Sequence, residues 1–80
     1  MIMTTNEAFG LVMKQLRKER KWSGYELAFQ LESDQKYISD VECGKRNVSL
    51  AFFERVARVF GLRCYELAEL VERKAIAPNL

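Results

Sequence analysis

Hydrophobic residues recur along the chain at the three- and four-residue spacing of amphipathic helices. Phe9, Met13 and Leu16 form the first such set, and this spacing places them on one face of a helix. Asn6 stands just before the set, and its side chain is suited to capping the free N–H groups of a helix start. The pattern therefore predicts a first helix over residues 7–20.

Two shorter helices are predicted next. Ser23 is followed three residues later by Glu26, the spacing of a capping box, and this predicts a second helix that ends near Leu31. Ser33 or Asp34 can cap a third helix. Only about three residues then separate the two helices, a length typical of a tight turn between steeply crossed helices.

Glycines mark the ends of the third and fourth predicted helices. Gly44 favours a left-handed stop, and a polar loop over residues 45–48 follows it. Ser49 can cap a fourth helix over residues 50–60, which Gly61 ends. A broad apolar stripe along this helix predicts that it packs against the core.

The last segment predicts a fifth helix over residues 64–74, followed by a frayed tail over residues 75–80 that contains Pro78. No segment carries a convincing strand pattern. We therefore expect an all-α fold class with five helices in a compact arrangement. A chain this short has room for one modest core, so residues 1–80 are expected to form a single domain with its core in residues 7–74.

Composition narrows the chemistry that the chain can perform. The 80 residues are 49% hydrophobic and 30% charged, as in an ordinary folded globule. There is no histidine, and Cys43 and Cys64 are the only cysteines, so we expect no metal site, no cofactor, no catalytic residues and no enzymatic activity. Reduced thiols, together with the lack of a long apolar run or a signal-peptide pattern, predict a cytoplasmic protein with no membrane partner.

Positive charge is concentrated in one segment, although the formal net charge is only +2. The five cations of this segment are Lys14, Arg17, Lys18, Arg20 and Lys21, opposed only by Glu19. A basic run of this kind is commonly a solvated helix face. The net charge is also too small to imply a polyanionic partner by itself.

Five short motifs follow one another in a fixed order over about residues 9–68. They are Phe9-Gly10, Leu16-Arg17-Lys18, Ser23-x-x-Glu26-Leu27-Ala28, Tyr37-Ile38-Ser39-Asp40-Val41-Glu42 and Gly44-Lys45-Arg46-Asn47-x-Ser49-Leu50. At these spacings the set resembles the Xre family of helix-turn-helix regulators, which includes the Cro and lambda-repressor-like proteins. Residues 34–39 and 44–50 resemble in particular the small controller proteins of restriction–modification systems.

The resemblance implies a five-helix domain whose second and third helices form the DNA-binding motif, with the third helix in the major groove of double-stranded DNA. The sequence departs from the family at several positions. Members usually carry glutamine at the position of Gly24 and favour glycine at that of Glu32. The backbone N–H of Gly24 remains able to meet a phosphate, whereas Glu32 adds a negative charge near the expected DNA surface.

Within this frame, Gln35, Lys36 and Ser39 are predicted to read base edges, because they project from the exposed face of the third helix near its start. The alternative is that they are merely solvated. Asp40 could accept a hydrogen bond from a cytosine amine, but we favour its pairing with Lys36 four residues earlier. The residues predicted to contact the DNA backbone are Ser23, Gly24, Tyr25, Tyr37, Lys45, Arg46 and Asn47.

Three further side chains receive structural interpretations. The resemblance implies that Arg17 pairs with Glu42, because family members commonly join an arginine of the first helix to this glutamate. Trp22 precedes the cap of the second helix and is expected to pack against that helix. Tyr37 has two interpretations, since it could lie along the DNA backbone or support the turn.

One recognition helix contacts only a few base pairs, so we expect a homodimer on an inverted repeat. Leu67, Leu70 and Val71 of the fifth helix are the expected interface, by elimination and by the family resemblance. No small-molecule ligand is evident. The predicted function is a sequence-specific, autoregulatory transcription regulator, and the resemblance implies a restriction–modification controller. The alternative is an antitoxin-type module that uses the same fold to bind a protein.

Overall fold

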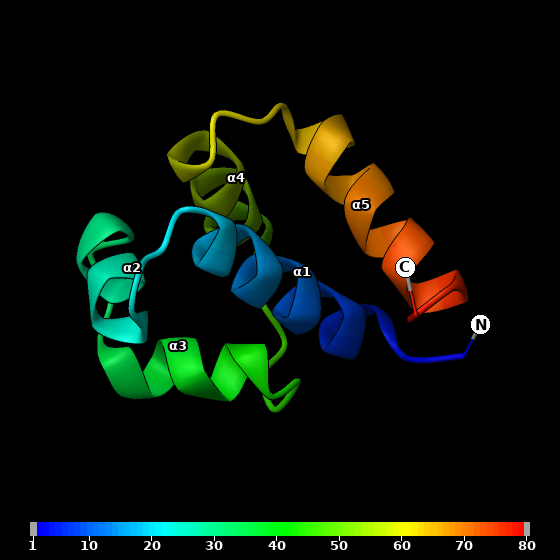
Figure 1. The fold of residues 1–80 in the computed structure, drawn as a ribbon, viewed down its shortest axis with the longest axis horizontal. Coiled ribbons are helices and arrows are strands. Elements are labelled where there is room, and N and C mark those ends of the chain that lie inside the picture. The colour runs from blue at the N-terminus through cyan, green and yellow to red at the C-terminus, as the bar shows by residue number, and fades with distance from the viewer. Residues whose placement is uncertain (1, 80) are drawn as a thin grey trace.

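Five helices joined by short turns make up the computed structural model, which describes residues 2–79 (Figure 1). They are α1 (Thr5–Glu19), α2 (Gly24–Gln30), α3 (Gln35–Glu42), α4 (Leu50–Val59) and α5 (Cys64–Ile76). No strand occurs within residues 2–79, and no helix there is long and apolar enough to cross a membrane. The expected all-α class with five helices is confirmed; the two ends of the expected 1–80 domain, residues 1 and 80, lie outside the described part.

Side-chain caps start the helices where the sequence predicted them, with one exception. Ser23, Asp34 and Ser49 each accept a hydrogen bond from the backbone N–H three residues further on, at 3.0, 2.7 and 3.0 Å. At the first helix the cap is Thr4, and the prediction of Asn6 was wrong. Thr4 and Glu7 form a reciprocal capping box, which satisfies two backbone N–H groups at once, whereas Asn6 lies inside α1.

The core is built around α1, which packs against α3 on one side and α5 on the other (Figure 1). The largest fully buried side chains come from all five helices and are Phe9, Met13, Leu27, Leu31, Ile38, Val41, Val56 and Leu67. α1 and α3 meet at Gly10, where a Cβ atom would lie 2.2 Å from the carbonyl oxygen of Val41. This contact fixes α3, and with it the expected recognition surface, directly against the middle of α1.

The start and the end of the described chain lie side by side (Figure 1). The carbonyl oxygen of Ala75 accepts hydrogen bonds from the backbone N–H groups of Ile2 and Met3, at 3.1 and 3.4 Å, and Ala75 is buried. α5 therefore continues to Ile76, and the prediction of a frayed tail was wrong for its first residues. Ala75 extends the buried row four residues beyond Val71, so packing holds the helix together.

Left-handed backbone ends several helices. Gly44 and Gly61 have φ angles of 75° and 68°, which confirms their predicted roles as helix stops. Glu32, in the turn between α2 and α3, is also left-handed at φ 54°, although it has a side chain. Left-handed backbone disfavours a residue with a Cβ atom, so this turn carries local strain at the position where the related family favours glycine.

Replacing Glu32 by glycine is therefore expected to stabilise the protein by up to about 1 kcal/mol, because glycine adopts this conformation without steric cost. Urea denaturation measures the change in the free energy of unfolding. Glu32→Gln is the matched control, since it removes the charge and keeps the strained backbone, and it should leave stability unchanged. Equal stabilisation by both variants would show that charge, and not backbone conformation, limits this turn.

Candidate nucleic-acid interface

α2 and α3 form a helix-turn-helix unit whose turn is held by one hydrogen bond from α4 and one to α2. Leu31 is buried, and its carbonyl oxygen accepts a hydrogen bond from the guanidinium of Arg55, at 3.1 Å. The backbone N–H of Ser33 donates to the carbonyl oxygen of Ala28, at 2.9 Å. These two bonds join the turn to α4 and α2, and Ile38 of α3 is buried in the core, while other residues of α3 are exposed.

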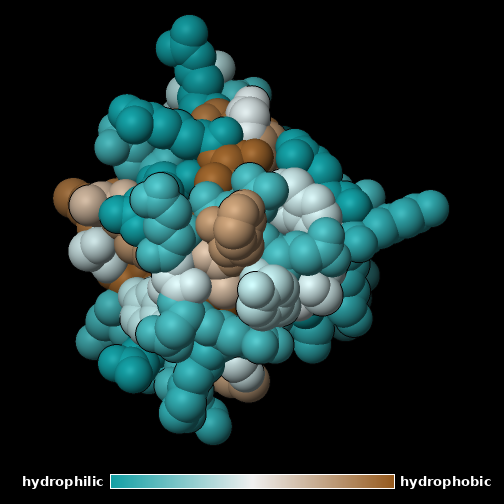
Figure 2. Space-filling model, turned by 90° about the vertical axis from the view of Figure 1, so that its left-hand side faces the viewer, coloured by the Kyte–Doolittle hydropathy of each residue, from teal (hydrophilic) through white to brown (hydrophobic). Residues whose placement is uncertain are grey.

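The three predicted base-reading residues lie together on the exposed side of α3. Gln35, Lys36 and Ser39 are all exposed and lie within the first five residues of α3. Figure 2 views the molecule from the side of α2 and the beginning of α3, where hydrophilic residues cover most of the surface. The arrangement suits a helix that meets base edges, and the contact itself stays a prediction.

The start of α2 lies close to the start of α3. A Cβ atom at Gly24 would be 3.8 Å from the side-chain Nε2 of Gln35, so a predicted backbone contact adjoins a predicted base contact. Tyr25 beside it is exposed. At Ser23 the backbone N–H donates to the Glu26 carboxylate at 3.1 Å, and the hydroxyl accepts from the Glu26 N–H. The hydroxyl proton of Ser23 is therefore the group that it can offer to a phosphate.

The loop after α3 places three more predicted contacts beside the same surface. Lys45, Arg46 and Asn47 are exposed. The Asn47 side chain accepts a hydrogen bond from the side chain of Asn6, which ties this loop to the start of α1. Sequence reasoning missed this role of Asn6, since no local pattern links residues 41 positions apart.

Tyr37 packs edge-on against Phe52 of α4, with ring centroids 5.3 Å apart. The guanidinium of Arg46 lies 5.5 Å from the centroid of the Tyr37 ring. Of the two interpretations of Tyr37, support of the turn and loop is therefore visible in the structure. A contact of its hydroxyl with the DNA backbone stays a prediction.

The basic run over residues 14–21 contains cations that stabilise the fold and cations that are exposed on the surface. Arg17 donates to both carboxylate oxygens of Glu42, at 2.8 and 3.1 Å, which confirms the predicted pair, and also to the carbonyl oxygen of Trp22 at 2.9 Å. The hydrogen bonds with Glu42 raise the pKa of Arg17 above its ordinary value. Arg20 lies over the rings of Trp22 and Phe60, at 5.4 Å from each centroid.

The Trp22 ring packs at a tilt of 36° against Phe60, which follows the last residue of α4, with ring centroids 5.6 Å apart. Trp22 also packs against the core, and its expected packing on the second helix stays a prediction. Two arginines of the basic run, Arg17 and Arg20, therefore serve the scaffold. The three lysines of the run, Lys14, Lys18 and Lys21, are exposed.

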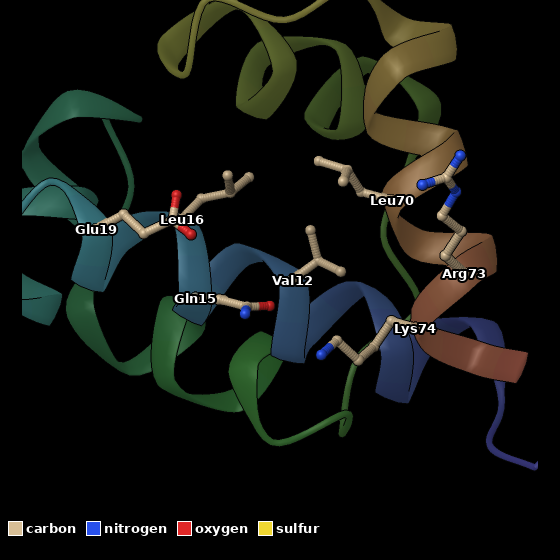
Figure 3. Close-up of a pocket in the computed structure, with 7 residues that line it drawn as sticks. All are labelled: Val12, Gln15, Leu16, Glu19, Leu70, Arg73 and Lys74. Carbon is tan, nitrogen blue, oxygen red and sulfur yellow. The ribbon is translucent and has the colours of Figure 1, made fainter. Parts of the chain in front are cut away.

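The predicted dimer interface needs a correction. Leu67 and Val71 are buried in the core of the single chain and cannot face a partner. Leu70 points across a groove toward Val12 and Leu16 of α1 (Figure 3). The spacing of these residues correctly predicted one apolar face of α5. Leu67 and Val71 of that face are covered by the chain's own helices, whereas Leu70 stays 37% exposed at the groove.

A different apolar surface is left uncovered between α4 and α5. Leu50 and Tyr65 are 87% and 70% exposed, and they line one shallow depression together with Phe53 and Ala68. These residues lie in the first halves of two consecutive helices, and sequence reasoning did not assign them to a shared surface. Exposed apolar side chains grouped in this way are typical of a surface for another protein chain.

Comparison with known proteins agrees with this geometry. Residues 13–67 match the helix-turn-helix family. This chain belongs to the helix-turn-helix family. It is 39% identical over 67 residues to the control protein C.MunI of a Mycoplasma species, covering 82% of this chain and 90% of the relative. It is 36% identical over 62 residues to the control protein C.BamHI of Bacillus amyloliquefaciens, covering 76% of each.

Solved structures give the same result. The restriction–modification controller protein C.AhdI from Aeromonas hydrophila superimposes with a TM-score of 0.70 at 34% identity, covering 76% of this chain and 92% of that one. The controller protein C.Esp1396I, solved as a tetramer with its 35-base-pair operator, superimposes with a TM-score of 0.80 at 20% identity, covering 92% and 97%. The resemblance to Xre-type regulators and to controller proteins, inferred from the motifs, is confirmed.

Proposed function

We propose that this chain is a cytoplasmic, non-enzymatic transcription regulator of the controller type, which binds its own operator as a homodimer. The observation that carries the proposal is the exposed polar face at the start of α3, with Gln35, Lys36 and Ser39 side by side. The start of α2 and the loop after α3 flank it with groups suited to phosphates. The identity with C.MunI and C.BamHI supports the controller assignment.

The direct test is binding to the DNA upstream of the chain's own gene, compared with a scrambled duplex of the same length, across a salt series. A controller should prefer the upstream duplex by about a thousandfold or more, and the preference should persist at physiological salt. Weak and equal binding that disappears as salt rises would refute the proposal, and a search for a protein partner would follow.

Base reading predicts a specific pattern of losses. Gln35→Ala and Lys36→Ala should each lower the preference for the operator by about 1–3 kcal/mol, since each removes one side chain placed to meet a base edge. Lys45→Ala is the contrasting variant. It should weaken binding to both duplexes alike and reduce the salt slope by about one, as expected for a phosphate contact. Unchanged operator preference in the first two variants would exclude them from base reading.

We place the dimer interface on the surface formed by Leu50, Tyr65, Phe53 and Ala68. Leu50→Glu should raise the dimer dissociation constant by about a hundredfold, because two symmetry-related leucines lose their burial. Leu50 is the first residue of α4, where an acidic side chain suits the helix dipole, so the monomer should stay folded. Sedimentation velocity reads the result. Leu70→Glu is the control, and a dimer disrupted by this variant alone would return the interface to α5.

A further inference from the structure

One carboxylate lies between two of the cations proposed to meet DNA. An oxygen of Asp40 is 3.6 Å from the Nζ of Lys36, and its other oxygen is 3.6 Å from the Nε of Arg46. The side chain of Asp40 is 18% exposed, whereas those of Lys36 and Arg46 are 84% and 52% exposed. Asp40 is therefore the central and least exposed member of the cluster, and the pairing with Lys36 favoured from the sequence is confirmed.

The cluster joins a proposed base contact to a proposed backbone contact. Lys36 belongs to α3, while Arg46 belongs to the loop that follows it. Arg46 also lies over the Tyr37 ring, and Tyr37 is anchored on Phe52. The guanidinium is thus oriented by a carboxylate and an aromatic ring before any DNA arrives.

Stability does not account for a carboxylate at this place. Ion pairs with a largely exposed partner, such as Lys36 or Arg46 here, contribute little to folding, because water already solvates the exposed cation well. A negative charge facing DNA also repels every phosphate and competes with DNA for the two cations. The Asp40 carboxylate can therefore improve operator recognition only if it weakens binding to some DNA sequences more than to others.

Such a difference follows from what each kind of DNA offers in exchange. When Lys36 turns toward guanine acceptors in an operator, the bases replace the carboxylate, and a neighbouring cytosine amine can donate to the released Asp40. Random DNA presents phosphates but not this set of base groups. Phosphates can then replace the carboxylate as partner of the cations, but no base group donates to the released Asp40. The carboxylate therefore weakens binding to random DNA more than binding to the operator.

We propose that Asp40 is a specificity-determining residue, which restrains Lys36 and Arg46 and thereby suppresses binding to non-operator DNA. This inference rests on the proposed function. It assigns the role in specificity to a residue that need not itself bind DNA tightly. It makes the specificity ratio, and not the affinity for the operator, the quantity that depends on Asp40.

The test compares Asp40→Asn with the wild-type protein on the upstream duplex and on a scrambled duplex, across a salt series. The amide has the shape of the carboxylate without its charge. Affinity for the scrambled duplex should rise about five- to tenfold, with a salt slope steeper by up to about one, because one more cation becomes available to phosphates. Operator affinity should rise less, so that the specificity ratio falls.

Two further variants serve as controls for the loss of charge and for the position of the carboxylate. Glu69→Gln removes the same charge from an exposed ion pair on α5, where Glu69 and Arg73 are 3.2 Å apart, and it should leave the ratio unchanged. Asp40→Glu keeps the charge and should retain most of the wild-type ratio of operator affinity to scrambled-duplex affinity. Thermal melting of each variant checks that the fold is retained.

Several outcomes would overturn the proposal. Unchanged affinity of Asp40→Asn for the scrambled duplex would show that Asp40 does not restrain the cations. Loss of operator affinity alone would make Asp40 a direct base contact. If the wild-type protein itself binds both duplexes equally, the proposed function fails, whereas tighter binding of Asp40→Asn to the scrambled duplex would still support restraint of the cations by Asp40.

Discussion

Replacing Gly10 by alanine is expected to destabilise the protein by about 3 kcal/mol or more, and to lower its melting temperature by about 15 °C. The added Cβ atom would lie 2.2 Å from the carbonyl oxygen of Val41 and 2.9 Å from that of Glu42. Both neighbours are backbone atoms of α3, so no side-chain rotation can relieve the overlap. The two helices must separate, and the core between them must open.

The direction of this effect is informative, because alanine in an unobstructed helix position is more stable than glycine by roughly 1 kcal/mol. Gly24→Ala is the matched control. Its Cβ atom would meet only the Gln35 side chain, at 3.8 Å, so this variant should be neutral or slightly stabilising. Urea denaturation of both variants measures the difference. A Gly10→Ala protein as stable as the wild type would mean that α1 and α3 do not approach as closely as described.

Arg17→Ala is expected to destabilise the protein by about 2–4 kcal/mol. The guanidinium makes two hydrogen bonds to the Glu42 carboxylate and one to the carbonyl oxygen of Trp22. The side chains of Arg17 and Glu42 are only 13% and 11% exposed, so the variant leaves a poorly solvated carboxylate without its partner. Since the pair joins α1 to the last turn of α3, its loss weakens the attachment of the proposed recognition helix to α1.

Two stability comparisons test this explanation, and a measurement of operator preference tests a direct role of Arg17 in DNA binding. Adding Glu42→Gln to Arg17→Ala should recover part of the lost stability, because it removes the unpaired charge. Arg73→Ala, which breaks an exposed pair with Glu69, should cost less than about 1 kcal/mol. The preference for operator over scrambled DNA should survive in the folded fraction of Arg17→Ala. A stable variant that has lost this preference would instead make Arg17 a DNA contact.

Helix starts and stops were predictable because their signals are local. The caps Ser23, Asp34 and Ser49 act within three residues of their own position, and Gly44 and Gly61 decide the backbone at a single residue. The first helix shows the limit of such signals. Asn6 was predicted as its cap, but Thr4 forms the capping box because Glu7 lies three residues after it.

The proposed DNA surface was predictable to a similar degree. Gln35, Lys36 and Ser39 follow a recognisable cap and are exposed, while Ile38 between them is buried. The link between Asp40 and Arg46 was not predictable, because it depends on how the loop after α3 folds back against the helix. The same holds for Asn6 and Asn47, which meet only because α1 starts beside that loop.

The sequence by itself determined the number of helices, most of their ends and which side chains share a face. Only the tertiary structure decided what each face touches: Leu67 and Val71 meet the chain's own core, while Leu50 and Tyr65 are left exposed. The physical reason is that periodicity is a property of one helix, read from neighbours in the chain. Contact between distant residues depends on how closely helices approach, which here is set by Gly10 and the Arg17–Glu42 pair.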